Sequence, residues 1–318
     1  MREQRSRAFY ILSAVFALYV LFLYGPTITI TVLSFQGPNG GLTFPLNGLS
    51  LHWFHNLWAG IGVPNVAGAL VNSLELGIVV TILTVVISLM AGLAYRRRFA
   101  GRNFIFYTAI ASLTLPSIIV SLGIALEFQI ANQSISGLGD TLSDSYGGDD
   151  VHGIAAILGA LGNGIENNFQ TLMGLFTSGL GAHLTWTLPF GLLIMFAIFN
   201  RFNPSYEEAA RDLGASAWQG FRYVVLPLVA PSLLGVALFG FTLSWDEIAR
   251  SSQAVGSANT LPLTLEGLTT TVTTPVIYAL GTVTTGVSFL VIGCILGCVF
   301  LVQARRRRYG SDAGKGLL

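Results

Sequence analysis

Long apolar stretches alternate with polar segments along this chain of 318 residues. Six of these stretches are long enough for an α-helix to cross a hydrocarbon core, which takes about 20 predominantly apolar residues. They cover residues 9–33, 74–95, 104–130, 178–199, 224–245 and 276–302. The pattern predicts an all-α integral membrane protein with six transmembrane helices.

The amino-acid composition supports a membrane protein and argues against several other classes. Hydrophobic residues make up 53% of the chain and charged residues only 10%, whereas about 25% of a soluble domain is charged. The basic residues form no patch interleaved with aromatic side chains, so nucleic acid is not expected as a partner. Cys294 and Cys298 lie in one apolar stretch and the histidines are scattered, so neither a metal site nor a cofactor is expected.

The basic residues predict the orientation in the membrane. All lysines and arginines except Arg250 lie in the N-terminal tail, in the loops after the second and fourth apolar stretches, or in the C-terminal tail. Cytoplasmic loops carry the excess of lysine and arginine. We therefore expect a multi-pass protein of the inner membrane with both termini in the cytoplasm.

This orientation gives a simple domain organisation. A transmembrane domain over residues 9–303 is flanked by a cytoplasmic N-terminus of residues 1–8 and a basic cytoplasmic tail of residues 304–318. An acidic, glycine-rich insert over residues 132–170 has no basic residue and falls on the outer side. We expect it to be a solvated external loop, with a short apolar helix near residues 154–161.

The segment EEAARDLGASAWQGFRYVVLPLVAP, which begins at Glu207, carries several helix-boundary signals. Asn203 is a suitable N-cap for a helix whose first residue is Pro204, and Gly214 is a suitable end for that helix. Ser216 followed by Gln219 is typical of a capping box, which predicts a second short helix running to the region of Pro227. The segment is thus expected to form two short helices that meet at a glycine.

The surface of this segment suits contact with another protein. Ala209, Ala210 and Gly214 have almost no side chain, so a partner can approach the backbone closely. Trp218, Phe221 and Val225 follow at helical spacing and are expected to pack against the neighbouring spans. An amphipathic loop that only connects two spans would carry the same helix signals, and these signals alone do not separate the two interpretations.

A detailed motif favours the docking interpretation. Glu208, Ala209 and Ala210 are followed after three residues by Gly214, and after nine more by Val224, one residue, Leu226 and Pro227. This pattern resembles the EAA loop of binding-protein-dependent ABC importer permeases, the MetI-like transmembrane subunits, and departs from it only in having valine for isoleucine. The resemblance implies that the loop docks on a cytoplasmic ATPase through residues Glu207, Glu208, Ala209, Ala210, Asp212, Gly214 and Pro227.

Shorter motifs place the chain within that family. The segments SFQ, RRRFAGR, LTLPSIIVSLGIAL, TLPF and LSWDEI resemble permeases of the spermidine/putrescine type. The resemblance implies a polyamine as the solute, an external binding protein, a dimer of cytoplasmic ATPase subunits and a second permease, usually a different chain. Related permeases for ferric iron, phosphonates and opine-like solutes share much of this pattern, so those cargoes remain open.

Acidic residues near the outer ends of the spans are candidates for the solute pathway, because a carboxylate at membrane depth usually faces a cavity or a partner. They are Asp246, Glu247, Glu75 and Glu127, and Trp245 beside them could contact an ammonium group by a cation–π interaction. Solvation at headgroup depth is the alternative for each acid, and anchoring at the interface is the alternative for the tryptophan. Arg250 is expected to pair with Asp246 or Glu247.

Two other function classes are less consistent with the sequence. The chain has no GxxxxGK[ST] phosphate loop and no constellation of nucleophile and base, so it is not expected to be an enzyme and ATP hydrolysis falls to a partner. An ATP-independent channel or carrier would have no use for a docking loop.

Pro116 and Pro189 lie inside predicted spans, where each could produce either a break or a kink.

Overall fold

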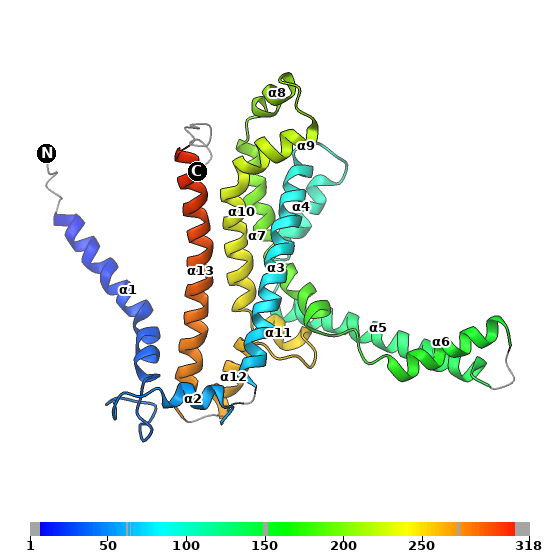
Figure 1. Ribbon diagram of the computed structural model, residues 1–318, viewed down its shortest axis with the longest axis horizontal. Coiled ribbons are helices and arrows are strands. Elements are labelled where there is room, and N and C mark those ends of the chain that lie inside the picture. The colour runs from blue at the N-terminus through cyan, green and yellow to red at the C-terminus, as the bar shows by residue number, and fades with distance from the viewer. Residues whose placement is uncertain (1–6, 62, 64, 149–151, 272–273, 309–318) are drawn as a thin grey trace. The chain divides into compact units, whose positions relative to one another are not determined.

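The computed structural model describes residues 7–61, 63, 65–148, 152–271 and 274–308, and within these ranges the protein is helical (Figure 1). A single β-bridge joins Gln36 to Leu49. The helices are α1 (Arg7–Leu33), α2 (His52–Trp58), α3 (Val66–Tyr95), α4 (Arg102–Ala111), α5 (Ser117–Tyr146), α6 (Ile154–Asn168), the π-helical turn η1 (Leu175–Gly179), α7 (Leu180–Arg201), α8 (Ser205–Asp212), α9 (Ala217–Gly220), the π-helical turn η2 (Phe221–Val225), α10 (Leu226–Trp245), α11 (Ala249–Ala254), α12 (Leu261–Thr271) and α13 (Val276–Arg308). The predicted all-α class is confirmed.

Six helical segments in the described part of the chain are long and apolar enough to cross a membrane. They are Arg7–Leu33, Val66–Tyr95, Ser117–Tyr146, Leu175–Arg201, Ala217–Trp245 and Val276–Cys298. The predicted number of spans is confirmed, and five of the six predicted stretches lie on the expected helices. The third stretch differs.

The predicted span over residues 104–130 is broken in the structure. Helix α4 ends at Ala111, and α5 begins only at Ser117, directly after Pro116. Proline has no N–H to donate and disfavours helical geometry at the residue before it, so the chain leaves the helix between these points. Helix α5 then departs from the direction of α4 (Figure 1). Pro189, in contrast, lies inside the continuous helix α7.

The insert over residues 132–170 is a helical hairpin, so its prediction as a loop was wrong. Helix α5 continues to Tyr146 and packs against α6, which is longer than the short helix expected near residues 154–161 (Figure 1). Gly159 and Gly162 lie directly against the backbone of α5, where a Cβ would collide with it. The glycines that suggested a loop are the residues that let the two helices approach each other.

The described chain forms two compact units, which we treat separately. The first lies within residues 1–69 and 264–290 and contains α1 and α2. The buried side chain of Gln36 organises the loop after α1, because its Nε2 donates to the carbonyls of Gly41, Thr43 and Pro45 at 3.3–3.4 Å. Its Oε1 accepts the N–H of Asn47 at 2.6 Å. This contact accounts for the glutamine of the SFQ segment in structural terms.

The second unit lies within residues 70–263 and 291–318 and contains the helices that carry the candidate site. A hydrophobic cluster in this unit is formed mainly by α7 and α10, and η2 contributes to it as well. The cluster contains Met195, Phe199, Phe202, Val225, Val229, Leu233 and Val236. This core supports the polar segment at one end of α10, and a separate buried network lies at the other end.

Candidate coupling loop and buried polar network

Helix α8 begins close to where the sequence predicts. The side chain of Asn203 accepts the N–H of Ser205 at 3.0 Å, which supplies the predicted cap. The helix begins at Ser205 rather than at Pro204, although Pro204 already has helical torsion angles. Glu207 and Glu208 lie in the first turn, where the helix dipole favours negative charge.

The end of α8 is a Schellman motif. Gly214 has a φ of +83°, its N–H donates to the carbonyl of Arg211 at 2.8 Å, and the N–H of Ala215 donates to the carbonyl of Ala210 at 3.0 Å. A residue with a Cβ would be strained at this positive φ, so the glycine terminates the helix as predicted.

The capping box after this turn is present. The Ser216 hydroxyl accepts the N–H of Gln219 at 3.3 Å, and the side-chain Oε1 of Gln219 accepts the N–H of Ser216 at 2.7 Å. The second helix does not end near Pro227, because α9 continues through η2 into α10. Pro227 is the second residue of α10 and lies just after the π-helical turn.

The loop exposes small and apolar residues. Glu208 and Ala209 are exposed, and the side chain of Leu213 is 90% exposed. Trp218 was predicted to pack against the neighbouring spans, but it is 64% exposed. Among the described residues its one ring contact is with Phe221, at 5.5 Å between the ring centroids. Exposed apolar residues on a rigidly capped loop are typical of a surface that contacts a partner.

An ion pair that the sequence did not reveal joins this loop to α3. Both terminal nitrogens of Arg96, which follows α3 directly, donate to the two carboxylate oxygens of Glu207 at 2.8 Å. The guanidinium also lies over the rings of Phe199 and Phe202, at 5.5 and 5.0 Å from their centroids. The hydrogen bonds from Arg96 lower the pKa of Glu207, and the nearby positive charges add to this effect against the opposing effect of burial. The carboxylate is therefore ionised at neutral pH.

At the other end of α10, Arg250 pairs with Glu247 rather than with Asp246. The backbone N–H and the Nη1 of Arg250 each donate to Glu247 at 3.0 Å. The arginine side chain is only 1% exposed and its guanidinium lies 4.6 Å from the ring centroid of Trp186. Glu247 is thus neutralised by a buried partner.

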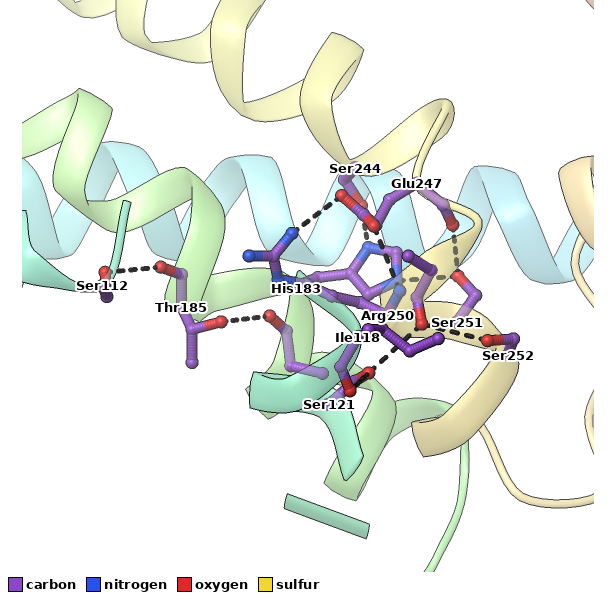
Figure 2. A network of polar contacts seen from close by, with 12 residues as sticks. Ser112, Ile118, Ser121, His183, Thr185, Ser244, Glu247, Arg250, Ser251 and Ser252 are labelled. Atoms are coloured by element: carbon purple, nitrogen blue, oxygen red, sulfur yellow. Dashed lines mark hydrogen bonds and ion pairs between the residues drawn. The ribbon is translucent and has the colours of Figure 1, made fainter. Parts of the chain in front are cut away.

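His183 on α7 connects three elements in the same region (Figure 2). Its Nδ1 lies 2.8 Å from the hydroxyl of Ser244 on α10, and its Nε2 lies 3.0 Å from the hydroxyl of Ser251 on α11. The Ser251 hydroxyl donates a hydrogen bond to the backbone carbonyl of Glu247 at 2.6 Å. It therefore accepts a hydrogen bond from Nε2 of the histidine. The contacts fit a neutral ring protonated on Nε2. No spacing pattern in the sequence indicates this histidine, because its partners lie on other helices.

The predicted acidic residues are not gathered into one cluster. Glu75 on α3 and Glu127 on α5 are exposed, and neither forms an ion pair within the described ranges. Asp246 is also exposed and without an ion pair among those residues, and partial burial together with the charge of Glu247 raises its pKa. Trp245 is only 4% exposed and stacks on Phe241, so in this conformation its ring is not open to a solute.

Comparisons with known proteins agree with this arrangement. The family model described as "Binding-protein-dependent transport system inner membrane component" matches residues 84–309. The spermidine/putrescine transport system permease protein PotC of Haemophilus influenzae is 27% identical over 280 residues, covering 87% of this chain and 91% of that protein. The protein of the same name from Escherichia coli K12 is 25% identical over 292 residues, covering 91% and 92%.

A relative with another cargo and a solved structure extend the comparison. The trehalose transport system permease protein SugB of Mycobacterium tuberculosis is 25% identical over 209 residues, covering 64% of this chain and 61% of that protein. A bacterial ABC transporter for import of the acidic polysaccharide alginate has a chain that superposes with a TM-score of 0.55 at 17% identity, covering 96% of this chain and 99% of that one. This likeness shows a shared fold.

The family model covers more than half of the chain. Proteins of this family are multi-pass inner membrane permeases that work with an ATPase and a solute-binding protein, and they are not themselves enzymes. The present chain belongs to the family of inner membrane components of binding-protein-dependent transport systems.

Proposed function

We propose that this permease carries a polyamine of the spermidine/putrescine type, delivered by an external binding protein. The observation that carries the proposal is the similarity to PotC permeases over about nine tenths of the chain. The exposed Asp246 supports it, because a carboxylate without a neutralising partner among the described residues attracts an ammonium group.

The pathway contribution of each acid differs in this proposal. Asp246 is the principal contact, since Arg250 neutralises Glu247. Glu75 and Glu127 are exposed and add negative potential along the route. Trp245 contacts the solute only in a conformation that uncovers its ring, which is consistent with alternating access.

The loop of α8 and α9 is proposed to dock on a dimer of cytoplasmic ATPase subunits. Its capped ends keep the shape of the loop constant, and its exposed residues offer the contact surface. The proposed coupling residues are Glu207, Glu208, Ala209, Ala210, Asp212, Gly214 and Pro227. In this orientation the tails at residues 1–8 and 304–318 are both cytoplasmic, and the domain between them spans the membrane.

A second permease, most simply a different chain, completes the proposed pathway. The membrane-crossing window of α1 has no buried residues within this chain, so its apolar surface is free to contact lipid or that second subunit. The PotC relatives are only 25–27% identical, and the trehalose permease is also similar to this chain. Another solute, such as a ferric, phosphonate or opine-like one, is therefore the second candidate cargo.

The test is solute-stimulated ATP hydrolysis by the complete transporter in nanodiscs, with its binding protein and a panel of polyamines, iron chelates, phosphonates and sugars. We expect a polyamine to stimulate the wild type and Asp246→Asn to lose that stimulation. Asp140→Asn, which removes another exposed acid from α5, is the matched control and is expected to respond like the wild type. Stimulation by a neutral or anionic solute alone would exclude a polyamine cargo.

A further inference from the structure

A cavity of about 780 Å³ lies beneath the α8–α9 loop. Its walls come from the end of α3, the first residue of α4, the end of α7, and the helices α8 and α9. These elements all belong to the second unit, and Figure 1 shows the end of α7 and helices α4, α8 and α9 gathered at one end of it. The lining residues that come from α3 and α7 lie in the last turns of these two spans.

The charges that line the cavity are strongly unbalanced. Arg96, Arg97, Arg102 and Arg211 line it, and Glu207 is the only acidic residue among the lining residues. Arg96 is already neutralised by Glu207. The other three arginines form no ion pair within the part of the chain that the structure describes. The cavity therefore holds three positive charges without an internal counter-charge.

One uncharged donor also lines the cavity. Tyr95 is buried, and its hydroxyl has no hydrogen-bond partner among the described residues. Arg102 is the first residue of α4, a helix whose N-terminus has no side-chain cap, so the positive end of this helix adds to the potential there. The rings of Phe196 and Phe199 also line the cavity, beside Tyr95 and Arg96 respectively.

We propose that this cavity binds a phosphate group, either on the headgroup of an anionic phospholipid or as a free phosphate. Guanidinium groups match the geometry of phosphate oxygens and can bind them in pairs, and three of them face the cavity without an acidic partner. The cavity lies at the ends of two helices that are long and apolar enough to cross a membrane, and such ends are expected near the depth of lipid phosphates. The bound group would lie beside the pair of Arg96 and Glu207 that holds the coupling loop, and this binding does not depend on which solute is carried.

The experiment measures the retention of phosphatidylglycerol by the purified full chain in native mass spectrometry. The protein is exchanged from nanodiscs of phosphatidylcholine alone or doped with phosphatidylglycerol. The cavity variant replaces three arginines by glutamine, and a control variant removes three exposed arginines that do not line the cavity. The cavity variant is Arg97→Gln, Arg102→Gln and Arg211→Gln, and the control is Arg98→Gln, Arg201→Gln and Arg222→Gln.

We expect the cavity variant to lose about tenfold or more in apparent affinity for phosphatidylglycerol, because it loses several charge-assisted contacts. The control is expected to stay close to the wild type. Replacing the three cavity arginines by lysine keeps the charge and is expected to retain most of the binding, which guards against a variant that only unfolds. Addition of the lipid is expected to raise the Tm of wild type and control more than that of the glutamine cavity variant.

Competition identifies the source of the phosphate. Displacement of the lipid by inorganic phosphate, with the same dependence on the cavity arginines, would assign the site to a free phosphate. Retention of the lipid in excess phosphate would assign it to the headgroup. The proposal would be overturned if the cavity and control variants retained the lipid equally and inorganic phosphate did not raise the Tm of the wild type.

Discussion

Removal of the Arg96 side chain is expected to release the coupling loop from α3. The pair with Glu207 makes two charge-assisted hydrogen bonds of 2.8 Å, and the two side chains are 23% and 18% exposed. Breaking a fully buried pair costs about 3–5 kcal/mol and an exposed pair contributes about 0–1 kcal/mol. For this intermediate exposure we expect Arg96→Ala to cost about 2 kcal/mol, which is roughly a 30-fold change in the docked population of the loop.

Hydrogen exchange measures this population directly. The amides of α8 are expected to exchange roughly 30-fold faster in Arg96→Ala, whereas Arg98→Ala, which removes an exposed neighbouring arginine, leaves them unchanged. The charge-reversed double variant Arg96→Glu with Glu207→Arg is expected to recover part of the protection. The lowered pKa of Glu207 gives a pH test. The ion pair contributes fully to the stability of the docked loop above the ordinary glutamate pKa, and this contribution is lost only as pH falls through the lowered pKa. Unchanged exchange in Arg96→Ala would refute the idea that this pair holds the loop.

Three further predictions concern other parts of the second unit. Gly159→Leu is expected to separate α5 from α6 and to expose the hairpin to limited proteolysis. Gly164→Leu places its side chain in open space and is expected to leave the cleavage rate unchanged. Equal cleavage of the two variants would contradict the close contact between the helices. Arg250→Met leaves the Glu247 carboxylate partly buried without its partner and is expected to cost about 3–5 kcal/mol, seen as a lower Tm, while the double variant with Glu247→Leu recovers most of it. The raised pKa of Asp246 means that this carboxyl takes up a proton at a higher pH than an ordinary aspartate. Polyamine-stimulated ATP hydrolysis by the wild type is therefore expected to decline as pH falls, starting above the ordinary aspartate pKa. Asp140→Asn should show the same decline, and a profile without this step would exclude Asp246 as the contact.

The features predicted correctly from the sequence are those set by neighbouring residues. The apolar spans follow from local composition, and the turn at Gly214 and the capping box at Ser216 follow from side chains that act within four residues. The insert was misread because glycine serves both loops and close helix contacts, and only the partner helix separates these roles. The pairs of Arg96 with Glu207 and of His183 with Ser244 and Ser251 join residues far apart in the chain, so no local pattern indicates them.

The helix α10, from Leu226 to Trp245, has a mechanical consequence. At 1.5 Å per residue it is about 30 Å long, with the loop proposed to meet the ATPase at one end and Asp246 directly after the other. A tilt of about 8° at the loop end of this helix displaces the far end by about 4 Å, which is more than the length of a hydrogen bond. A small movement of the loop is thus large enough to make or break a carboxylate contact at the opposite end, without any change in the structure of the helix between them.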